Sequence, residues 1–272
     1  MWSKNKPLLG AKQNWRHPLS KGLVSHWLMN EGGSGKVLDL VKNNHGTVTL
    51  ATIANGKFGK CLNFDLSTTQ YVTLSSTSLT AGSPFSLSWW EKINNNINAY
   101  PSRFTLPMSG TSNFFIVIRI QSDAVYAPLT WGISPNGNSS IKSSGVPSVA
   151  SSVGIWRHIV ITGINPNSTT VADYNVYVDG VSYVCSQGGT YGTITNNRIG
   201  FDGFDHGPDA SMDDIRIYNR ALSFQEVKQL YNNPFADVRP SRNSWSLNSI
   251  SAGGNPFSAR APYMKGVLSI KG

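Results

Sequence analysis

The stretch Phe85-Ser86-Leu87-Ser88-Trp89 decides the fold class, because large apolar residues alternate with serines along it. Successive side chains of a strand point to opposite faces, so this pattern predicts a strand with one apolar and one polar face. Residues 158–162 alternate in the same manner, and Asp179-Gly180 between two further short runs is typical of a two-residue hairpin turn. The centre of the chain therefore predicts an antiparallel sheet.

Outward from this centre, most apolar segments are short and end at Gly, Pro, Asn or Ser. We predict strands over Leu23–Leu28, Phe58–Phe64, Tyr71–Leu74, Phe85–Trp90, Phe114–Ile120, Trp156–Ile161, Asn175–Val178, Ser182–Cys185, Arg198–Phe201 and Met212–Tyr218. Many short strands with Gly-rich turns predict a two-sheet antiparallel jelly-roll sandwich, an all-β fold. Trp156 is expected in its core.

One short helix is predicted near the end of the folded part, over Ser223–Asn232. Ser223 and Glu226 have the spacing of a capping box, in which each side chain bonds a free backbone N–H of the first turn. Phe224, Val227, Leu230 and Tyr231 then fall on one face, and Pro234 ends the helix.

The net charge of +9 lies at the two ends of the 272-residue chain. Residues 1–21 and 234–272 are rich in Lys and Arg and nearly free of acids, whereas bases and acids balance between them. We therefore divide the chain into a basic N-terminal arm (1–21), a globular domain (22–233) and a basic C-terminal arm (234–272). The neutral domain argues against a basic groove for nucleic acid. The basic ends suit an acidic partner, or nucleic acid held loosely by phosphate contacts.

The arms combine bases with large aromatic residues, which plain solubilising tails do not need. Such segments suit attraction to an acidic surface followed by anchoring on it. We expect them to be poorly ordered alone and to bind an acidic protein lattice, such as a viral shell, or neighbouring copies of the chain. The candidate partner-binding residues are Trp2, Trp15, Arg16, Arg239, Arg242, Trp245, Phe257 and Tyr263.

Two further features bear on location. Cys61 and Cys185 are expected as buried free thiols, with a single bridge as the alternative. The first residues lack the apolar run of a signal peptide, and no stretch is long enough to cross a membrane. The sequence thus favours a protein made in a host cytoplasm and carried on a virion, without a membrane partner.

Several segments, in order along 22–233, resemble the concanavalin A-like, laminin G-like jelly-roll family. They are Gly22–Gly32, Lys57–Phe64, Phe85–Trp90, Gly154–Val160, Tyr177–Gly180 and Met212–Ser223. The resemblance implies a jelly-roll sandwich but no single function, because the fold serves many. More loosely, the leading Pro7–Gly10 and Trp15–Leu19 resemble phage-type proteins.

The family resemblance also implies a calcium ion between an early Asp loop and a late Asp pair. Here the oxygen ligands would come from Asp39, from the backbone carbonyls around Asn44 and His45, and from Asp213 or Asp214. The loop departs from the family pattern, since Leu40-Val41-Lys42 follows Asp39. The alternative is that one of the two late aspartates faces solvent and the other caps a loop.

Enzymatic chemistry is not favoured by the sequence. Glycoside hydrolysis needs two facing carboxylates, and Glu31, Glu91 and Glu226 are far apart in sequence. Sugar binding needs exposed aromatic rings, for which Tyr100, Tyr126, Trp131 and Tyr191 are candidates, with a place at the rim of the core as the alternative for each.

These observations favour a non-enzymatic structural or attachment module, a phage capsid decoration or appendage that displays a lectin-like domain. A free carbohydrate-binding lectin is the alternative, and a glycoside hydrolase is the least favoured.

Overall fold

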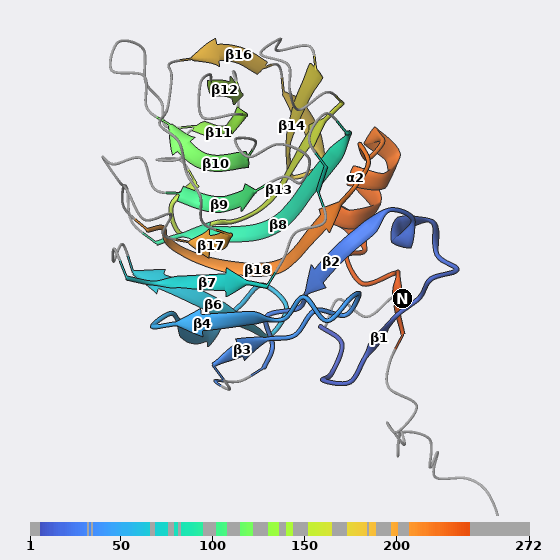
Figure 1. Ribbon diagram of the computed structural model, residues 1–272, viewed down its shortest axis with the longest axis vertical. Helices are drawn as coiled ribbons and strands as arrows, with labels where there is room; N and C mark the ends of the chain where they lie inside the picture. The colour runs from blue at the N-terminus through green and yellow to red at the C-terminus, as the bar shows by residue number, and fades with distance from the viewer. Residues whose placement is uncertain are drawn as a thin grey trace, which may run out of the picture. The chain divides into compact units, whose positions relative to one another are not determined.

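The computed structural model describes residues 6–31, 33, 35–65, 69–75, 79–80, 83–94, 102–107, 115–121, 130–135, 140–143, 152–164, 173–183, 185–188, 197–200 and 207–239. Within them the chain forms an antiparallel sandwich of two large sheets, as the sequence predicts (Figure 1). Residues 240–272 lie outside the described residues.

The first sheet has the strand order β16-β12-β11-β10-β9-β17-β7-β4-β3. In chain order, its strands are β3 (Lys36–Val37), β4 (Gly46–Thr49), β7 (Tyr71–Leu74), β9 (Ser102–Pro107), β10 (Phe115–Gln121), β11 (Thr130–Pro135), β12 (Ser140–Ser143), β16 (Cys185–Gly188) and β17 (Arg198–Gly200).

The second sheet has the order β15-β14-β13-β8-β18-β6-β5, and β2 pairs with β18 outside this path. Its strands are β2 (Leu23–Trp27), β5 (Thr52–Asn55), β6 (Lys60–Asp65), β8 (Phe85–Ile93), β13 (Trp156–Gly163), β14 (Tyr174–Val178), β15 (Val181–Tyr183) and β18 (Asp209–Tyr218). The predicted hairpin joins β14 to β15, with positive φ at both Asp179 and Gly180.

The alternation along β8 separates the two faces of the second sheet. Phe85, Leu87 and Trp89 pack in the main core between the sheets, with Trp27, Phe64 and Phe104. Ser86, Ser88 and Trp90 take the opposite positions and lie on the outer face. The expectation that Trp156 lies in the core is wrong, because its side chain is only half-buried. Lys92 Nζ lies above its ring, 5.9 Å from the centroid.

A β-bulge in β18 turns the middle of that strand. The register with β8 shifts between Asp213 and Arg216, and Asp214 adopts a positive φ of 46°. The extra residue lets Met212 and Ile215 both reach the main core. Asp213, Asp214 and Arg216 are nevertheless buried, so the outer face beside them is covered.

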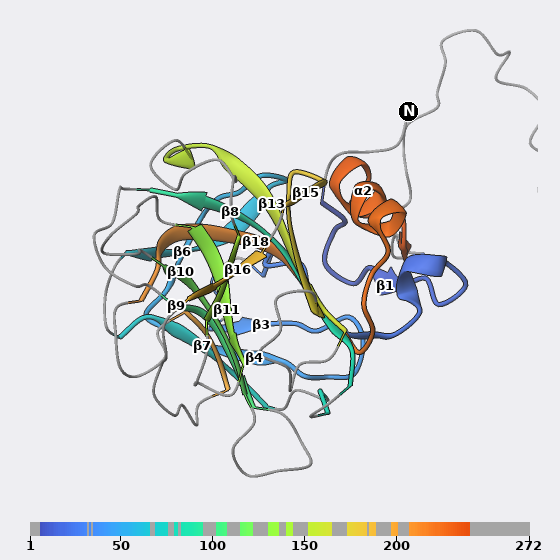
Figure 2. The same ribbon diagram turned by 90° about the horizontal axis from the view of Figure 1, so that it is seen from above.

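A third layer supplies this cover. It consists of α2 (Phe224–Asn232) and of residues 6–21, which we call the strap; both lie outside β13, β8 and β18 (Figure 2). The strap contains β1 (Lys12–Gln13), which pairs with β19 (Val238–Arg239), and a 3-10 turn, η1 (Pro18–Ser20). A second apolar cluster joins the layers through Leu19, Val160, Tyr218, Val227 and Leu230.

The described part of the predicted N-terminal arm is therefore not a free arm. Lys6, Gln13 and Leu19 are buried against the domain, and so are Phe235 and Asp237 beyond the predicted end at 233. Their partners are far away in sequence, which is why the charge pattern alone suggested loose ends. The folded unit extends from the strap to β19.

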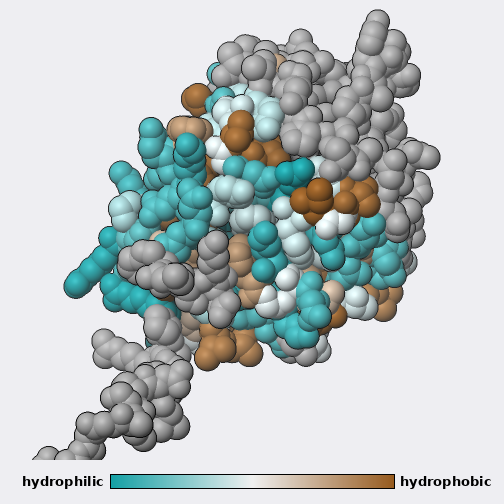
Figure 3. Space-filling model, turned by 180° about the vertical axis from the view of Figure 1, so that it is seen from behind, coloured by the Kyte–Doolittle hydropathy of each residue, from teal (hydrophilic) through white to brown (hydrophobic). Residues whose placement is uncertain are grey.

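Two further expectations, the capping box and the buried free thiols, are confirmed. Ser223 and Glu226 form the predicted capping box of α2. Cys61 and Cys185 are free and buried, and burial raises the pKa of each thiol to about 11. No helix among the described residues is long and apolar enough to cross a membrane. Figure 3 shows hydrophobic groups set among hydrophilic ones on the face it presents.

Candidate functional site

A small pocket opens where the β5–β6 loop meets the C-terminal end of α2. We call it the aromatic pocket. Its volume is about 210 Å³, the room of about seven water molecules. It is lined by Lys57, Phe58, Trp90, Tyr231, Asn232 and Pro234.

The aromatic walls come from three different elements. Trp90 lies on the outer face of β8 because its neighbour Trp89 occupies the inner face. Tyr231 comes from the last turn of α2, and Phe58 from the β5–β6 loop. The Trp90 ring stacks on Tyr231 with centroids 5.7 Å apart and meets the edge of Phe58 at 5.2 Å. Such contacts stabilise by about 0.5–1.5 kcal/mol beyond area burial.

Two polar groups in this cluster have no hydrogen-bond partner among the described residues. They are the indole N–H of Trp90 and Nδ1 of His158, whose ring centroid lies 5.0 Å from that of Trp90. Both side chains are almost fully buried. Burial lowers the pKa of His158 to about 3, so the imidazole is neutral at physiological pH, with Nε2 2.9 Å from Ser88 Oγ.

The loop that carries Lys57 and Phe58 is held by hydrogen bonds to β18 and to the strap. The Phe58 N–H donates to Asp213 Oδ2 at 3.3 Å, and the Phe58 carbonyl accepts from the Lys6 N–H at 3.1 Å. Gly56 has no room for a side chain, because an added Cβ would lie 2.6 Å from that same Asp213 oxygen. Strap, loop and β18 thus hold one wall of the aromatic pocket in place.

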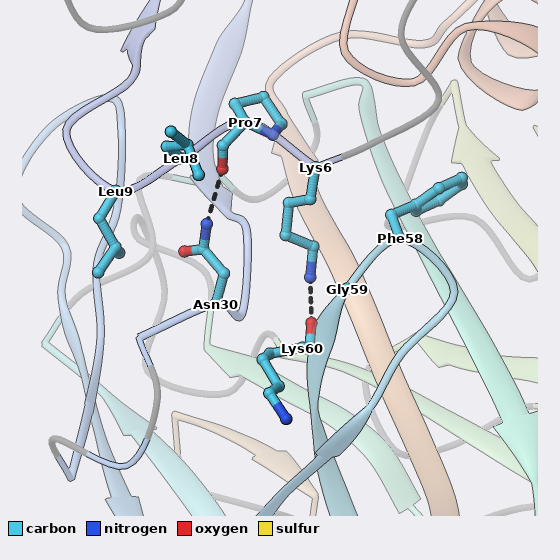
Figure 4. Close-up of a pocket in the computed structure, with 8 residues that line it drawn as sticks. All are labelled: Lys6, Pro7, Leu8, Leu9, Asn30, Phe58, Gly59 and Lys60. Atoms are coloured by element: carbon cyan, nitrogen blue, oxygen red, sulfur yellow. Dashed lines mark hydrogen bonds between the residues drawn. The ribbon is translucent and has the colours of Figure 1, made fainter. Parts of the chain in front are cut away.

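A second, larger pocket of about 420 Å³ shares Phe58 with the first (Figure 4). Leu8 and Leu9 of the strap line it and are 73% and 56% exposed. Its polar contacts are already made: Asn30 Nδ2 donates to the Pro7 carbonyl at 2.8 Å, and the Lys6 ammonium bonds the Lys60 carbonyl and Asp213. This pocket therefore offers shape but few free polar groups.

A buried ionic network lies under the strap. His26 Nε2 is 2.7 Å from Asp214 Oδ1, Arg216 Nη1 donates to Asp237 Oδ2 at 2.9 Å, and Gln13 Nε2 donates to the same oxygen at 2.7 Å. Burial opposes the charge of Asp214, but Arg216 and His26 still hold the pKa of that carboxyl at about 2. The network holds the third layer on the sheet.

Comparison with known proteins identifies the family. Residues 66–228, more than half of the chain, match the family described as the concanavalin A-like lectin/glucanases superfamily. The chain belongs to this superfamily. No curated protein sequence matches the chain.

One solved domain has a similar fold. Domain 4 of AbnA, a GH43 extracellular arabinanase from Geobacillus stearothermophilus in complex with arabinotriose, is similar with a TM-score of 0.52 and 19% identity. The match covers 81% of this chain and 98% of that domain. The binding domain of Paraclostridial Mosquitocidal Protein 1 matches at a TM-score of 0.49 and 18% identity, over 80% of this chain and 53% of the other. At these identities the likeness is one of fold.

The calcium site implied by the superfamily resemblance does not fit the observed contacts. Asp39 Oδ1 accepts backbone N–H groups from His26 and Val41, and Oδ2 accepts those of Lys42 and Asn44, at 2.8–3.2 Å. The Asp39 side chain thus caps its own loop.

The remaining predicted calcium ligands are also engaged. Asp213 pairs with Lys6, and Asp214 with His26 and Arg216. His45 Nδ1 accepts the Asp39 N–H at 3.0 Å, and the Asn44 carbonyl accepts the Trp27 indole N–H at 2.9 Å. Among the described residues no three His, Cys, Asp or Glu side chains gather as a metal site.

Of the four predicted sugar-stacking residues, only Trp131 belongs to a described strand. Trp131 is the second residue of β11, opposite Ile120 of β10. Tyr100, Tyr126 and Tyr191 lie outside the described residues. The sequence missed Trp90 and Tyr231 as site residues, although two successive Trp in one strand already imply that one of them is on the outer face.

Of the predicted partner-binding residues, three are described. Trp15 is 58% exposed, Arg16 is exposed, and Arg239 is exposed on β19 directly opposite Lys12 of β1. Trp2, Arg242, Trp245, Phe257 and Tyr263 lie outside the described residues.

The three glutamates are engaged separately. Glu31 Oε1 accepts the Leu38 N–H at 2.9 Å, and buried Glu91 lies 3.3 Å from the indole nitrogen of Trp89. Glu226 caps α2 and pairs with Arg220 at 2.7 Å.

Proposed function

We propose that this chain is a non-enzymatic carbohydrate-binding module whose saccharide binds in the aromatic pocket. The observation that carries the proposal is the indole N–H of Trp90, buried in the wall of a pocket without an acceptor among the described residues. A buried donor without a partner costs about 1–3 kcal/mol. A saccharide that moves the side chains around Trp90 apart as it binds would let a sugar hydroxyl accept from this N–H, and the cost would be removed.

The pocket walls also suit a saccharide. Phe58 and Tyr231 present partly exposed rings, against which the C–H face of a sugar packs, and Asn232 and Lys57 add polar groups at the rim. Membership of a lectin-containing superfamily, and the fold shared with a domain solved with arabinotriose, support the same function.

A hydrolytic role has less support. Hydrolysis requires two carboxyl groups about 5–9.5 Å apart around one substrate. None of the residues that line the aromatic pocket is acidic, and each glutamate of the chain bonds elsewhere.

The test is a glycan array followed by calorimetry, with arabinotriose among the probes. Trp90→Phe keeps the aromatic ring and removes the donor, so we expect it to fold and to lose about tenfold or more in affinity, as the loss of one such bond implies. Trp156→Phe is the matched control, because Trp156 does not line the pocket. Wild-type affinity of Trp90→Phe would contradict the proposal.

A second candidate function is attachment to an acidic assembly, such as the capsid of a phage that carries the protein as a decoration or appendage. It is favoured by the pairing of Lys12 directly opposite Arg239, two exposed like charges, with the exposed Trp15 nearby in sequence. Like charges directly opposite each other destabilise a strand pair, and an acidic partner would relieve the repulsion.

Reversal of both charges, Lys12→Glu with Arg239→Glu, tests attachment. We expect the double variant to fold but to stop co-sedimenting with phage heads. If it co-sediments as the wild type does, this surface makes no such contact. Self-association measured without heads distinguishes neighbouring copies as the partner.

A further inference from the structure

The exposed lysine at the rim of the aromatic pocket lacks an acidic partner. Lys57 Nζ lies 5.0 Å from the centroid of the Trp90 ring, and no carboxylate of the described residues pairs with it. A cation above a ring at an exposed site is only weakly stabilised. A hydrogen bond between two charged groups is stronger, so the ammonium gains by moving to an anion.

The charges around the pocket leave this lysine uncompensated. Among the described residues, none that lines the aromatic pocket or the larger pocket beside it is acidic. The acid behind the loop is Asp213, which accepts the Phe58 N–H and is neutralised by the Lys6 ammonium. Lys60, which lines the larger pocket, adds a second exposed cation next to Phe58 and Gly59.

One feature opposes an anion here. Tyr231 and Asn232 belong to the last turn of α2, whose carbonyls give that end a partial negative charge. This effect is weaker than a charge-assisted hydrogen bond. The lysine therefore dominates.

We propose that the saccharide of the aromatic pocket is acidic and that Lys57 binds its carboxylate. The inference rests on the proposed function and adds the ligand class. Lys57 and the Trp90 indole are two donors in the walls of one small pocket, and the aromatic rings of Phe58 and Tyr231 complete it. A uronic-acid or similar ring has the matching groups: one carboxylate, acceptor hydroxyls and an apolar C–H face.

The test uses pairs of sugars that differ only in charge. An array holds galacturonate, glucuronate and sialic acid oligosaccharides beside their methyl esters and beside neutral glycans, and calorimetry follows on the strongest pair. We expect the wild type to bind the acid at least tenfold tighter than the ester. Lys57→Met should bind both as the wild type binds the ester, whereas the matched control Lys60→Met should keep most of the preference.

The outcomes separate the two proposals. Equal wild-type binding of acid and ester, lost in Trp90→Phe, would overturn the acidic ligand and leave the carbohydrate-binding function in place. A preference for the acid that survives in Lys57→Met would also overturn the role of Lys57. No binding to any glycan on the array would overturn the carbohydrate-binding function itself.

Discussion

The two faces of β8 are both buried, but by different means. On the inner face Phe85, Leu87 and Trp89 pack against apolar side chains of the opposite sheet. On the outer face Ser86 Oγ donates to the Arg220 carbonyl at 2.8 Å, and Ser88 Oγ lies 2.9 Å from His158. A two-layer sandwich leaves such an outer face to water. Here a third layer keeps water from this face, and the two serines bond to the chain just before α2 and to the neighbouring strand β13.

This difference explains where a binding site can arise. Packing on the inner face leaves few polar groups to satisfy, and the Trp89 indole N–H there donates to Glu91. Each polar group on the outer face needs a partner from the sheet itself, from the segments that cover it or from a ligand. Arg216 finds Asp237, and His26 finds Asp214. The Trp90 indole finds none among the described residues, and it lines a pocket.

The largest expected effect is on the inner face. Trp89→Ala removes a fully buried ring and should lower the free energy of unfolding by about 3–5 kcal/mol. Trp156→Ala is the control, since its half-buried ring should cost far less. Urea unfolding of both variants measures the difference, and equal losses would show that the inner face does not dominate.

A comparable but smaller loss is expected on the outer face. Asp237→Ala leaves the fully buried Arg216 without its strongest partner, and removing one member of a buried pair costs about 3–5 kcal/mol. Arg216 would keep its contact with Asp214, at 3.4 Å, so we expect a loss of about 3 kcal/mol, the lower end of this range. A stability equal to the wild type would mean that this network does not hold the third layer.

The smallest effect is a pH dependence at Asp213. Burial raises the pKa of this carboxyl to about 6, despite the Lys6 ammonium beside it. A raised pKa means that the folded state holds the proton more tightly, so this contribution to stability is full below about pH 4 and is lost as the pH rises through about 6.

Over that window the loss of stability amounts to at most roughly 3 kcal/mol, because a change of one in the pKa corresponds to about 1.4 kcal/mol. Unfolding measured from pH 4 to 7 should show it in the wild type and not in Asp213→Asn. An identical pH profile for the two proteins would contradict the burial of an ionisable Asp213.

The sequence predicted those parts of the fold that depend on local patterns. Alternation placed β8 and β13, Asp179-Gly180 placed the hairpin, and the capping box placed α2. It did not predict the strap, because Lys6 meets Asp213 and Gln13 meets Asp237 across more than two hundred residues. A count of charges cannot reveal such long-range pairs.

The sequence did not predict the aromatic pocket for a related reason. A period of two assigns Trp90 to the outer face, but only the third layer turns that face into a pocket wall. The predicted calcium ligands do not fit a metal site, because their carboxylates already have partners. Asp39 bonds within its own loop, and Asp213 and Asp214 pair with residues far away in sequence. Residue type alone did not distinguish these uses.

The central claim is that the strap is part of the fold, and hydrogen exchange of the intact chain tests it most directly. The Asn14 N–H donates to the Asp237 carbonyl at 2.7 Å, and the Ser20 and Lys21 N–H groups close η1 at 2.9 and 3.0 Å. We therefore expect peptides from residues 11–21 to be protected to a degree comparable with β18. Complete exchange of 11–21 within seconds, while β18 stays protected, would contradict the claim and leave the outer face of the sheet uncovered.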